Sequence, residues 1–121
     1  MKFVIPADEN KDNTTICQSF GRAPYFLLVD TQTDKKEFFE NSAASSAGGA
    51  GIAAAQLIVD SGAEAVLLPR CGENAAKVLK AANINLYKTT GDSMAENIAD
   101  FAAGKLPELD KIHPGFHGHG G

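Results

Sequence analysis

The second half of the chain alternates between short apolar runs and segments with helical periodicity. Ala65–Leu68 and residues 84–87 are short apolar runs bounded by turn-forming residues, a pattern typical of buried strands. Between them, residues 73–82 repeat apolar side chains at helical spacing, so we expect a helix there. Strands separated by helices pair in parallel through crossovers, so this alternation restricts the chain to a layered α/β sheet.

Three further strands are predicted in the first half of the chain. Residues 2–5 form an apolar run that Pro6 is expected to end. Tyr25–Asp30 is the strongest strand pattern, and Lys35–Glu40 follows after a turn as its hairpin partner. Residues 52–61 have a helical composition and are followed by a glycine, which predicts the first helix.

A third helix is predicted near the end of the folded region. Ser93 and Glu96 have the spacing of a capping box, which satisfies backbone N–H groups at the start of a helix. The helical periodicity ends at Gly104. The apolar stripe of this helix consists of Met94, Ile98, Phe101 and Ala102.

These elements predict an α/β fold with one mixed five-stranded sheet flanked by three helices. Right-handed crossovers place the fourth strand beside the first, which gives the order 3-2-1-4-5 with the second strand antiparallel. The first strand is then the switch point, where ligands of open α/β sheets bind outside the carboxyl ends of the strands. We expect one domain over residues 1–110 and a flexible Gly/His-rich tail over residues 111–121.

Charge and hydropathy argue against several classes of partner. The chain has 11 Lys and Arg against 15 Asp and Glu, a net charge of -4, and its cations are scattered. Nucleic-acid binding needs clustered cations, and no apolar run approaches the roughly 20 residues of a membrane span. No signal-peptide pattern is present and only two cysteines occur. The sequence therefore predicts a cytoplasmic protein with free thiols, as a monomer or weak dimer.

Both cysteines are candidate ligands because they lie in loops at the carboxyl edge of the predicted sheet. Cys71 precedes the predicted second helix and follows Arg70. The helix dipole and the guanidinium would lower the pKa of this thiol and favour the thiolate. Cys17 lies in the long loop after the first strand. The alternative is structural: Cys71 as a small buried residue at a strand–helix turn, and Cys17 as a space-filling residue in an anchored loop.

A Ser/Gly-rich loop over residues 45–51 could hold an anion before the first helix. The backbone N–H groups of Gly48 and Gly49 can approach a phosphate or a cluster closely, and Arg22 could supply a positive charge. The loop matches neither the dinucleotide fingerprint nor the Walker pattern. Close packing of the helix on the sheet explains these glycines equally well.

The three histidines, His113, His117 and His119, all lie near the C-terminus. Neutral imidazoles suit transition metals, so His117 and His119 are candidate metal ligands. The alternative is a solvated tail that picks up metal only incidentally. Because the body of the domain contains no histidine, a Ser-His-Asp or Cys-His arrangement would have to recruit the tail. We therefore predict no catalytic residues.

Four segments of the sequence resemble one known family. They are Met-Lys-Phe-Val-Ile-Pro at residues 1–6, Ser-Phe-Gly-Arg-Ala-Pro-Tyr-Phe at 19–26, Gly-Gly-Ala-Gly at 48–51 and Cys-Gly-Glu-Asn-Ala at 71–75. Together they are similar to the dinitrogenase iron–molybdenum cofactor biosynthesis family, which includes accessory proteins of NifX and NafY type and the C-terminal domain of NifB. The resemblance covers about residues 1–110. It implies a three-layer ribonuclease H-like fold with a mixed five-stranded sheet.

The resemblance implies binding, carriage or insertion of a metal–sulfur cluster, such as an iron–sulfur or molybdenum–iron–sulfur cluster, rather than catalysis. It also implies a cluster-assembly protein as partner. Many members have His where this chain has Ser19 and Ala47. Thiolates are good ligands for iron–sulfur units, so Cys17 and Cys71 are the favoured replacements.

In this hypothesis Arg22 and the backbone of Gly48 and Gly49 contact the anionic cluster, and His117 and His119 are optional ligands. Two alternatives remain. The chain could be an interaction or chaperone module without metal. It could also be a thiol redox protein in which Cys71 is the nucleophile and Cys17 the resolving thiol.

Overall fold

A mixed five-stranded sheet forms the centre of the computed structural model, which describes residues 1–109. Its strand order is β3-β2-β1-β4-β5. β2 pairs antiparallel with both β1 and β3, whereas β4 pairs parallel with β1 and β5. The predicted order and the antiparallel second strand are confirmed. The strands are β1 (Lys2–Ala7), β2 (Tyr25–Asp30), β3 (Lys35–Glu40), β4 (Ala65–Leu68) and β5 (Asn85–Lys88).

β1 continues through Pro6 to Ala7, so the prediction that Pro6 ends this strand is wrong. Pro6 faces Phe26 in the register with β2, and its carbonyl accepts a hydrogen bond from the backbone N–H of Cys17 at 3.0 Å. The N–H and C=O of one strand residue point to the same side. The missing N–H of Pro6 therefore faces the loop and removes no hydrogen bond from the β1–β2 ladder.

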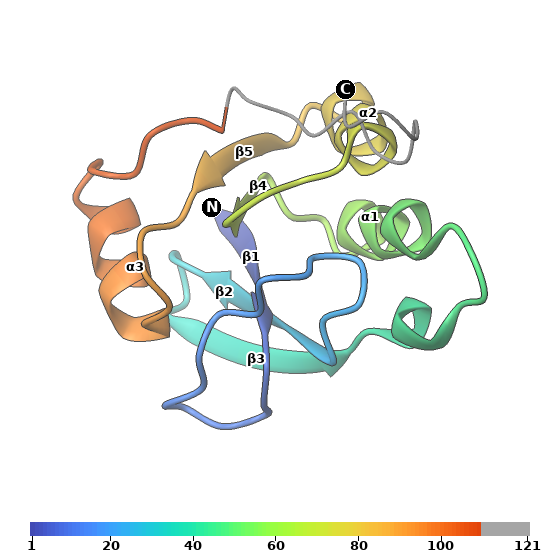
Figure 1. The fold of residues 1–121 in the computed structure, drawn as a ribbon. Helices are drawn as coiled ribbons and strands as arrows, with labels where there is room; N and C mark the ends of the chain where they lie inside the picture. Colours follow the sequence, from blue (N-terminus) through green and yellow to red (C-terminus); the bar gives the residue numbers. More distant parts are fainter. Residues whose placement is uncertain (110–121) are drawn as a thin grey trace.

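Helices cover both faces of the sheet and complete three layers (Figure 1). α1 (Ala50–Asp60) and α2 (Glu73–Ala81) lie side by side on one face, and α3 (Met94–Ala102) covers the other. Alternate residues of β1 point to the two faces, as the pleat of a strand requires. Val4 packs in the core beneath α1 and α2, whereas Phe3 packs in the core beneath α3.

Several helix boundaries differ from the prediction. α1 begins at Ala50, and a short 3-10 helix, η1 (Ser42–Ser45), occupies part of the predicted loop before it. α2 ends one residue early, at Ala81. In α3 the predicted apolar stripe is wrong at Ala102, which is exposed, while the polar Asn97 is fully buried. Among the described helices, none is long and apolar enough to cross a membrane.

The outer edge of β5 is covered by the chain that follows α3. The N–H of Lys88 donates to the carbonyl of Pro107 at 2.8 Å, and the N–H of Leu109 donates to the carbonyl of Leu86 at 2.9 Å. Leu109 is 7% exposed and belongs to the core beneath α1 and α2. Residues 107–109 are thus hydrogen-bonded to the outer edge of β5, so the folded domain extends at least to Leu109. The predicted tail, 111–121, lies outside the described residues.

Candidate functional site

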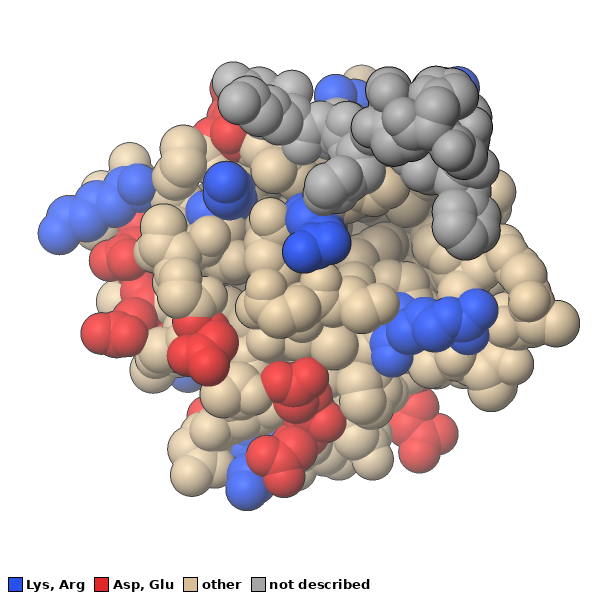
Figure 2. Space-filling view, viewed as in Figure 1, with Lys and Arg blue, Asp and Glu red and all other residues tan. Residues whose placement is uncertain are grey.

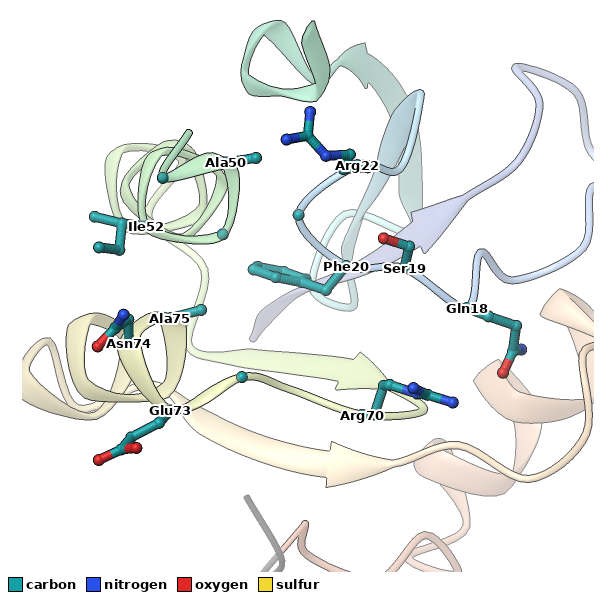
Figure 3. A pocket seen from close by; sticks show the side chains of 14 residues that line it. Gln18, Ser19, Phe20, Arg22, Ala50, Ile52, Arg70, Glu73, Asn74 and Ala75 are labelled. Atoms are coloured by element: carbon teal, nitrogen blue, oxygen red, sulfur yellow. The ribbon is translucent and has the colours of Figure 1, made fainter. Parts of the chain in front are cut away.

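A cleft of about 430 Å³ opens at the carboxyl edge of the sheet, next to the predicted switch point. Three segments enclose it: the loop of residues 18–22, the first turn of α1, and the β4–α2 loop with the first turn of α2 (Figure 3). The loop of residues 18–22 lies in the segment after β1, the β4–α2 loop follows β4, and the remaining wall is the start of α1. The topology therefore places the cleft where open α/β sheets bind their ligands.

Two helices begin at this cleft without a side-chain cap. The N-cap residues of α1 and α2 are Gly49 and Gly72, which have no side chain that could accept a hydrogen bond from the N–H groups of the first turn. By contrast, Ser93 caps α3 by accepting from the N–H of Glu96 at 3.2 Å, as the sequence predicted. The first-turn N–H groups of α1 and α2 lack an intrahelical acceptor, and helix N-termini carry a partial positive charge. The cleft is therefore suited to an anion.

The loop of residues 18–22 lies directly on the first turn of α1. A Cβ atom added to Gly21 would lie 2.9 Å from both the Cα and the N of Gly51, so only glycine fits there. The buried amide of Asn41 fixes the loop from below, because its Nδ2 donates to the carbonyls of Gly21 at 3.1 Å and Ala23 at 2.9 Å. No local pattern in the sequence marks this role of Asn41, because its hydrogen-bond partners are about 20 residues away in the chain.

Apolar side chains contribute to the wall of the cleft. Figure 3 shows the ring of Phe20 directed between α1 and α2, toward Ala75. Phe20 is 5% exposed and its ring stacks against Phe26, with centroids 5.5 Å apart. Ile52 lines the cleft from α1 and is 44% exposed, an unusual value for a large apolar residue. The cleft thus combines backbone N–H groups with apolar contact area.

The two arginines at the cleft have different roles. Arg22 extends toward η1, and its Nη1 donates to the carbonyls of Ala44 at 2.8 Å and Ser46 at 3.0 Å. Its guanidinium therefore ties two loops together. Arg70 lies in the β4–α2 loop, and its side chain extends toward Gln18 at the mouth of the cleft. From the sequence, Arg70 was considered only for its effect on the thiol of Cys71, although its position just after a strand at this edge is the signal that could have placed it in the cleft.

The two predicted glycines are placed differently. Gly49 lines the cleft with φ 68°, in the left-handed region that favours glycine. Gly48 is exposed and does not line the cleft. Figure 2 shows the lysine and arginine side chains on one side of the molecule as separate groups, with uncharged surface and acidic side chains between them.

Both cysteines are free and lie in the core rather than in the wall of the cleft. Cys17 is 9% exposed and Cys71 is 1% exposed. Their Sγ atoms donate to the carbonyls of Ser19 and Gly72, each at 3.5 Å. Their chain neighbours line the cleft, so the thiols lie behind its wall.

Burial raises the pKa of both thiols, and it raises the pKa of Cys71 to about 11. The expectation that the helix dipole and Arg70 lower the pKa of Cys71 is therefore wrong. Desolvation of the thiol outweighs the positive charge of Lys80, which is the group within residues 1–109 that lowers this pKa.

The described residues contain no ready-made metal site. Within residues 1–109, no group of three or more His, Cys, Asp or Glu side chains is arranged to hold a metal ion. The candidate ligands His117 and His119 lie outside the described residues. The wall of the cleft presents helix N-termini, the charged residues Arg22, Arg70 and Glu73, and apolar side chains, whereas both thiols lie behind it.

Comparison with known proteins agrees with this architecture. Residues 1–104 match the family described as dinitrogenase iron-molybdenum cofactor. An uncharacterized protein of Methanocaldococcus jannaschii is 32% identical over 113 residues, which cover 91% of this chain and 92% of that protein.

Two solved structures share the fold over nearly the whole chain. The apo form of the orange protein from Desulfovibrio gigas superimposes with a TM-score of 0.84 at 28% identity, covering 90% of this chain and 92% of that one. A Thermotoga protein of the DUF35 family, provisionally assigned as NifB, superimposes with a TM-score of 0.81 at 32% identity, covering 92% and 95%.

Proposed function

This chain belongs to the dinitrogenase iron-molybdenum cofactor family, and we propose that it binds and carries an anionic metal–sulfur cluster in the cleft between α1 and α2. It is an accessory-type protein of cofactor assembly, and the cluster is its cargo. We infer no catalytic step. The observation that carries the proposal is the meeting of two uncapped helix N-termini, at Gly49 and Gly72, in one cleft.

The cleft suits a cluster held without a bond from a protein thiolate. Metal–sulfur clusters with sulfide ligands carry net negative charge, which the first-turn N–H groups and Arg70 would neutralise. Phe20 and Ile52 supply apolar contact for the weakly hydrated sulfide surface. A volume of about 430 Å³ lies in the range of small-ligand sites.

The cysteines fit a ligand role less well. Cys71 is 1% exposed, and its pKa of about 11 keeps it protonated at neutral pH. A thiol must lose its proton to bind a metal, so ligation by Cys71 would need both movement of the β4–α2 loop and proton release. The same burial and pKa argue against the redox alternative, in which Cys71 would attack as a thiolate.

The proposed cargo implies a partner that delivers or receives it. A carrier must release its cluster, and non-covalent retention by N–H groups and a guanidinium allows transfer without breaking a metal–thiolate bond. Ile52, exposed at the mouth of the cleft, is the side chain that a docking cluster-assembly protein would cover. We expect this exchange to take place in the cytoplasm.

The test is anaerobic loading of the full chain. Wild type and a Cys17→Ala, Cys71→Ala double variant are incubated with tetrathiomolybdate, with and without ferrous iron, then desalted and analysed for molybdenum, iron and sulfide. Stoichiometric metal and matching absorption spectra in both proteins are expected. Loss of metal from a double variant with wild-type circular dichroism would assign the cluster to the thiolates instead. No metal in wild type would leave the interaction module as the better description.

A further inference from the structure

We propose that the outer edge of β3 pairs with the same edge of a second copy of this chain, so that two sheets join into one. β3 and β5 are the two edge strands of the sheet (Figure 1). Residues 107–109 cover the edge of β5 through backbone hydrogen bonds, whereas within residues 1–109 the backbone of β3 bonds only to β2. An uncovered strand edge presents N–H and C=O groups that another strand can use.

The register shows which backbone groups of β3 face outward. The N–H of Asn41 donates to the carbonyl of Pro24 at 3.1 Å, so these two residues point toward each other. Backbone groups alternate sides along an antiparallel strand, so every second residue counted back from Asn41 also bonds to β2. The residues between them direct their N–H and C=O groups away from the sheet, and these are Lys36, Phe38 and Glu40.

One register makes this edge complementary to itself. A two-fold axis perpendicular to the sheet pairs two antiparallel β3 strands about a single central residue. With Phe38 at the centre, the two Phe38 side chains lie opposite each other, and Lys36 of each copy lies opposite Glu40 of the other. All of these residues direct their backbone groups outward, so the pairs can exchange hydrogen bonds. Aromatic pairs and opposite charges across strands both stabilise the pairing.

The neighbouring registers are less favourable. Centring the pair on Glu37 places two carboxylates opposite each other, and centring it on Lys36 does the same with two ammonium groups. Like charges directly opposite each other destabilise a strand pair. Centring on Phe39 places Glu40 opposite Phe38 and forms no ion pair. The charges on β3 therefore select one register and favour a second copy over a strand of arbitrary sequence.

The side chains needed for this pairing are accessible. Lys36 and Glu40 are exposed, and neither forms an ion pair with another side chain of residues 1–109. Phe38 packs against the core beneath α3 but is only partly buried, so a second strand would cover the remainder of its ring. No residue of β3 lines the cleft between α1 and α2. The dimer would therefore carry two separate clefts.

The experiment is sedimentation equilibrium of the full chain without metal, from about 10 µM to about 1 mM. We expect wild type to shift from monomer toward dimer over this range. Lys36→Glu and Glu40→Lys each place like charges opposite each other, so each should raise the Kd of the dimer about tenfold or more. An equimolar mixture of these two variants should associate again, because opposite charges then meet at both pairs.

Lys35→Glu is the matched control. It makes the same change of charge one residue away, and in the proposed register Lys35 lies opposite the uncharged Asn41. Its Kd should stay within about threefold of wild type. As a second readout, amide hydrogen exchange at Lys36, Phe38 and Glu40 should be slower in the concentrated wild-type protein than in the dilute one.

Three results would overturn the proposal. The first is a wild type that remains monomeric throughout the range. The second is an equal rise of Kd in Lys35→Glu and Lys36→Glu. The third is a mixture of Lys36→Glu and Glu40→Lys that associates no more tightly than either variant alone. The samples contain neither metal nor sulfide, so such a failure would leave the proposed cluster binding untouched.

Discussion

Because α2 begins without a side-chain cap, one substitution at its start should raise the stability of the fold and weaken the proposed cluster binding at the same time. Gly72 has φ -73° and ψ 158°, an extended conformation that any residue adopts, and an added Cβ would meet no atom within 4 Å. An aspartate at this position can accept from the first-turn N–H groups as an N-cap. Gly72→Asp therefore places a carboxylate where we propose that the anionic cargo binds.

The magnitudes follow from the position of the carboxylate. Relative to glycine, an aspartate cap contributes a few tenths of a kcal/mol, and its charge at the helix N-terminus contributes about 0.3–1 kcal/mol more. We expect a gain of about 1 kcal/mol in the free energy of unfolding. Repulsion between this charge and a dianion about 5 Å away is about 1.7 kcal/mol even at the dielectric constant of water, which weakens binding roughly tenfold or more.

The assay combines urea denaturation with a tetrathiomolybdate titration followed by absorption under anaerobic conditions. Gly72→Asn is the matched control, because it provides a similar cap without the charge. We expect both variants to be more stable than wild type, and the aspartate variant to bind tetrathiomolybdate less tightly than the asparagine variant. Wild-type affinity in Gly72→Asp would refute the placement of the cargo at α2. An unchanged or lower stability of both variants would refute the claim that this helix start lacks a cap.

Three further predictions test the structure around the cleft. Cys71 has a pKa of about 11 in the fold, so stability that is complete below about pH 8 falls as pH rises toward 11, by on the order of 2 kcal/mol. In urea denaturation, the free energy of unfolding of wild type should fall by this amount between about pH 8 and about pH 11, whereas that of Cys71→Ala should lack this contribution. Gly21→Ala should lower the free energy of unfolding by about 1–3 kcal/mol, because its Cβ meets backbone atoms at 2.9 Å. Gly48→Ala, in open space, should differ from wild type in urea denaturation by less than about 0.5 kcal/mol. Asn97→Leu should cost about 2–4 kcal/mol, since it removes the three hydrogen bonds that the fully buried Asn97 amide makes with the backbone of Thr90 and Ser93, and should speed amide hydrogen exchange in residues 89–93. An Asn97→Leu variant that exchanges like wild type would contradict the bracing role of this amide.

Much of the fold could be predicted from the sequence because its signals are local. The bounds of Tyr25–Asp30, Lys35–Glu40 and Ala65–Leu68 agree with the structure residue for residue, since turn-forming residues delimit each run. The strand order then followed from the handedness of crossovers, which holds whatever the side chains are. Pro6 shows the limit of local rules. Whether a proline is tolerated in a strand depends on which neighbour its missing N–H faces, and only the register decides that.

The sequence predicted a site at the carboxyl edge of the sheet, and the structure has a cleft at that edge, but several of the predicted residues do not line it. The cysteines, Arg22 and Gly48 were chosen for the chemistry of their side chains or backbone. In the structure the thiols lie behind the wall of the cleft, Arg22 binds carbonyls of η1, and Gly48 stands outside. Phe20 and Arg70, which were not among the predicted site residues, line the cleft together with Arg22.

The sequence by itself determined the architecture of this protein and the edge of the sheet at which the cleft lies, because periodicity, turns and crossover handedness act over short stretches of chain. The tertiary structure alone decided which groups the cleft presents. The pKa of Cys71 rose rather than fell because burial among core residues outweighs a nearby helix dipole. Asn97 holds the loop after β5 because its amide forms hydrogen bonds with the backbone of Thr90. The buried hydroxyl of Thr89 has no hydrogen-bond partner within residues 1–109, because none of its spatial neighbours there supplies one. Desolvation and hydrogen bonding depend on neighbours that are distant in sequence, and no local pattern records them.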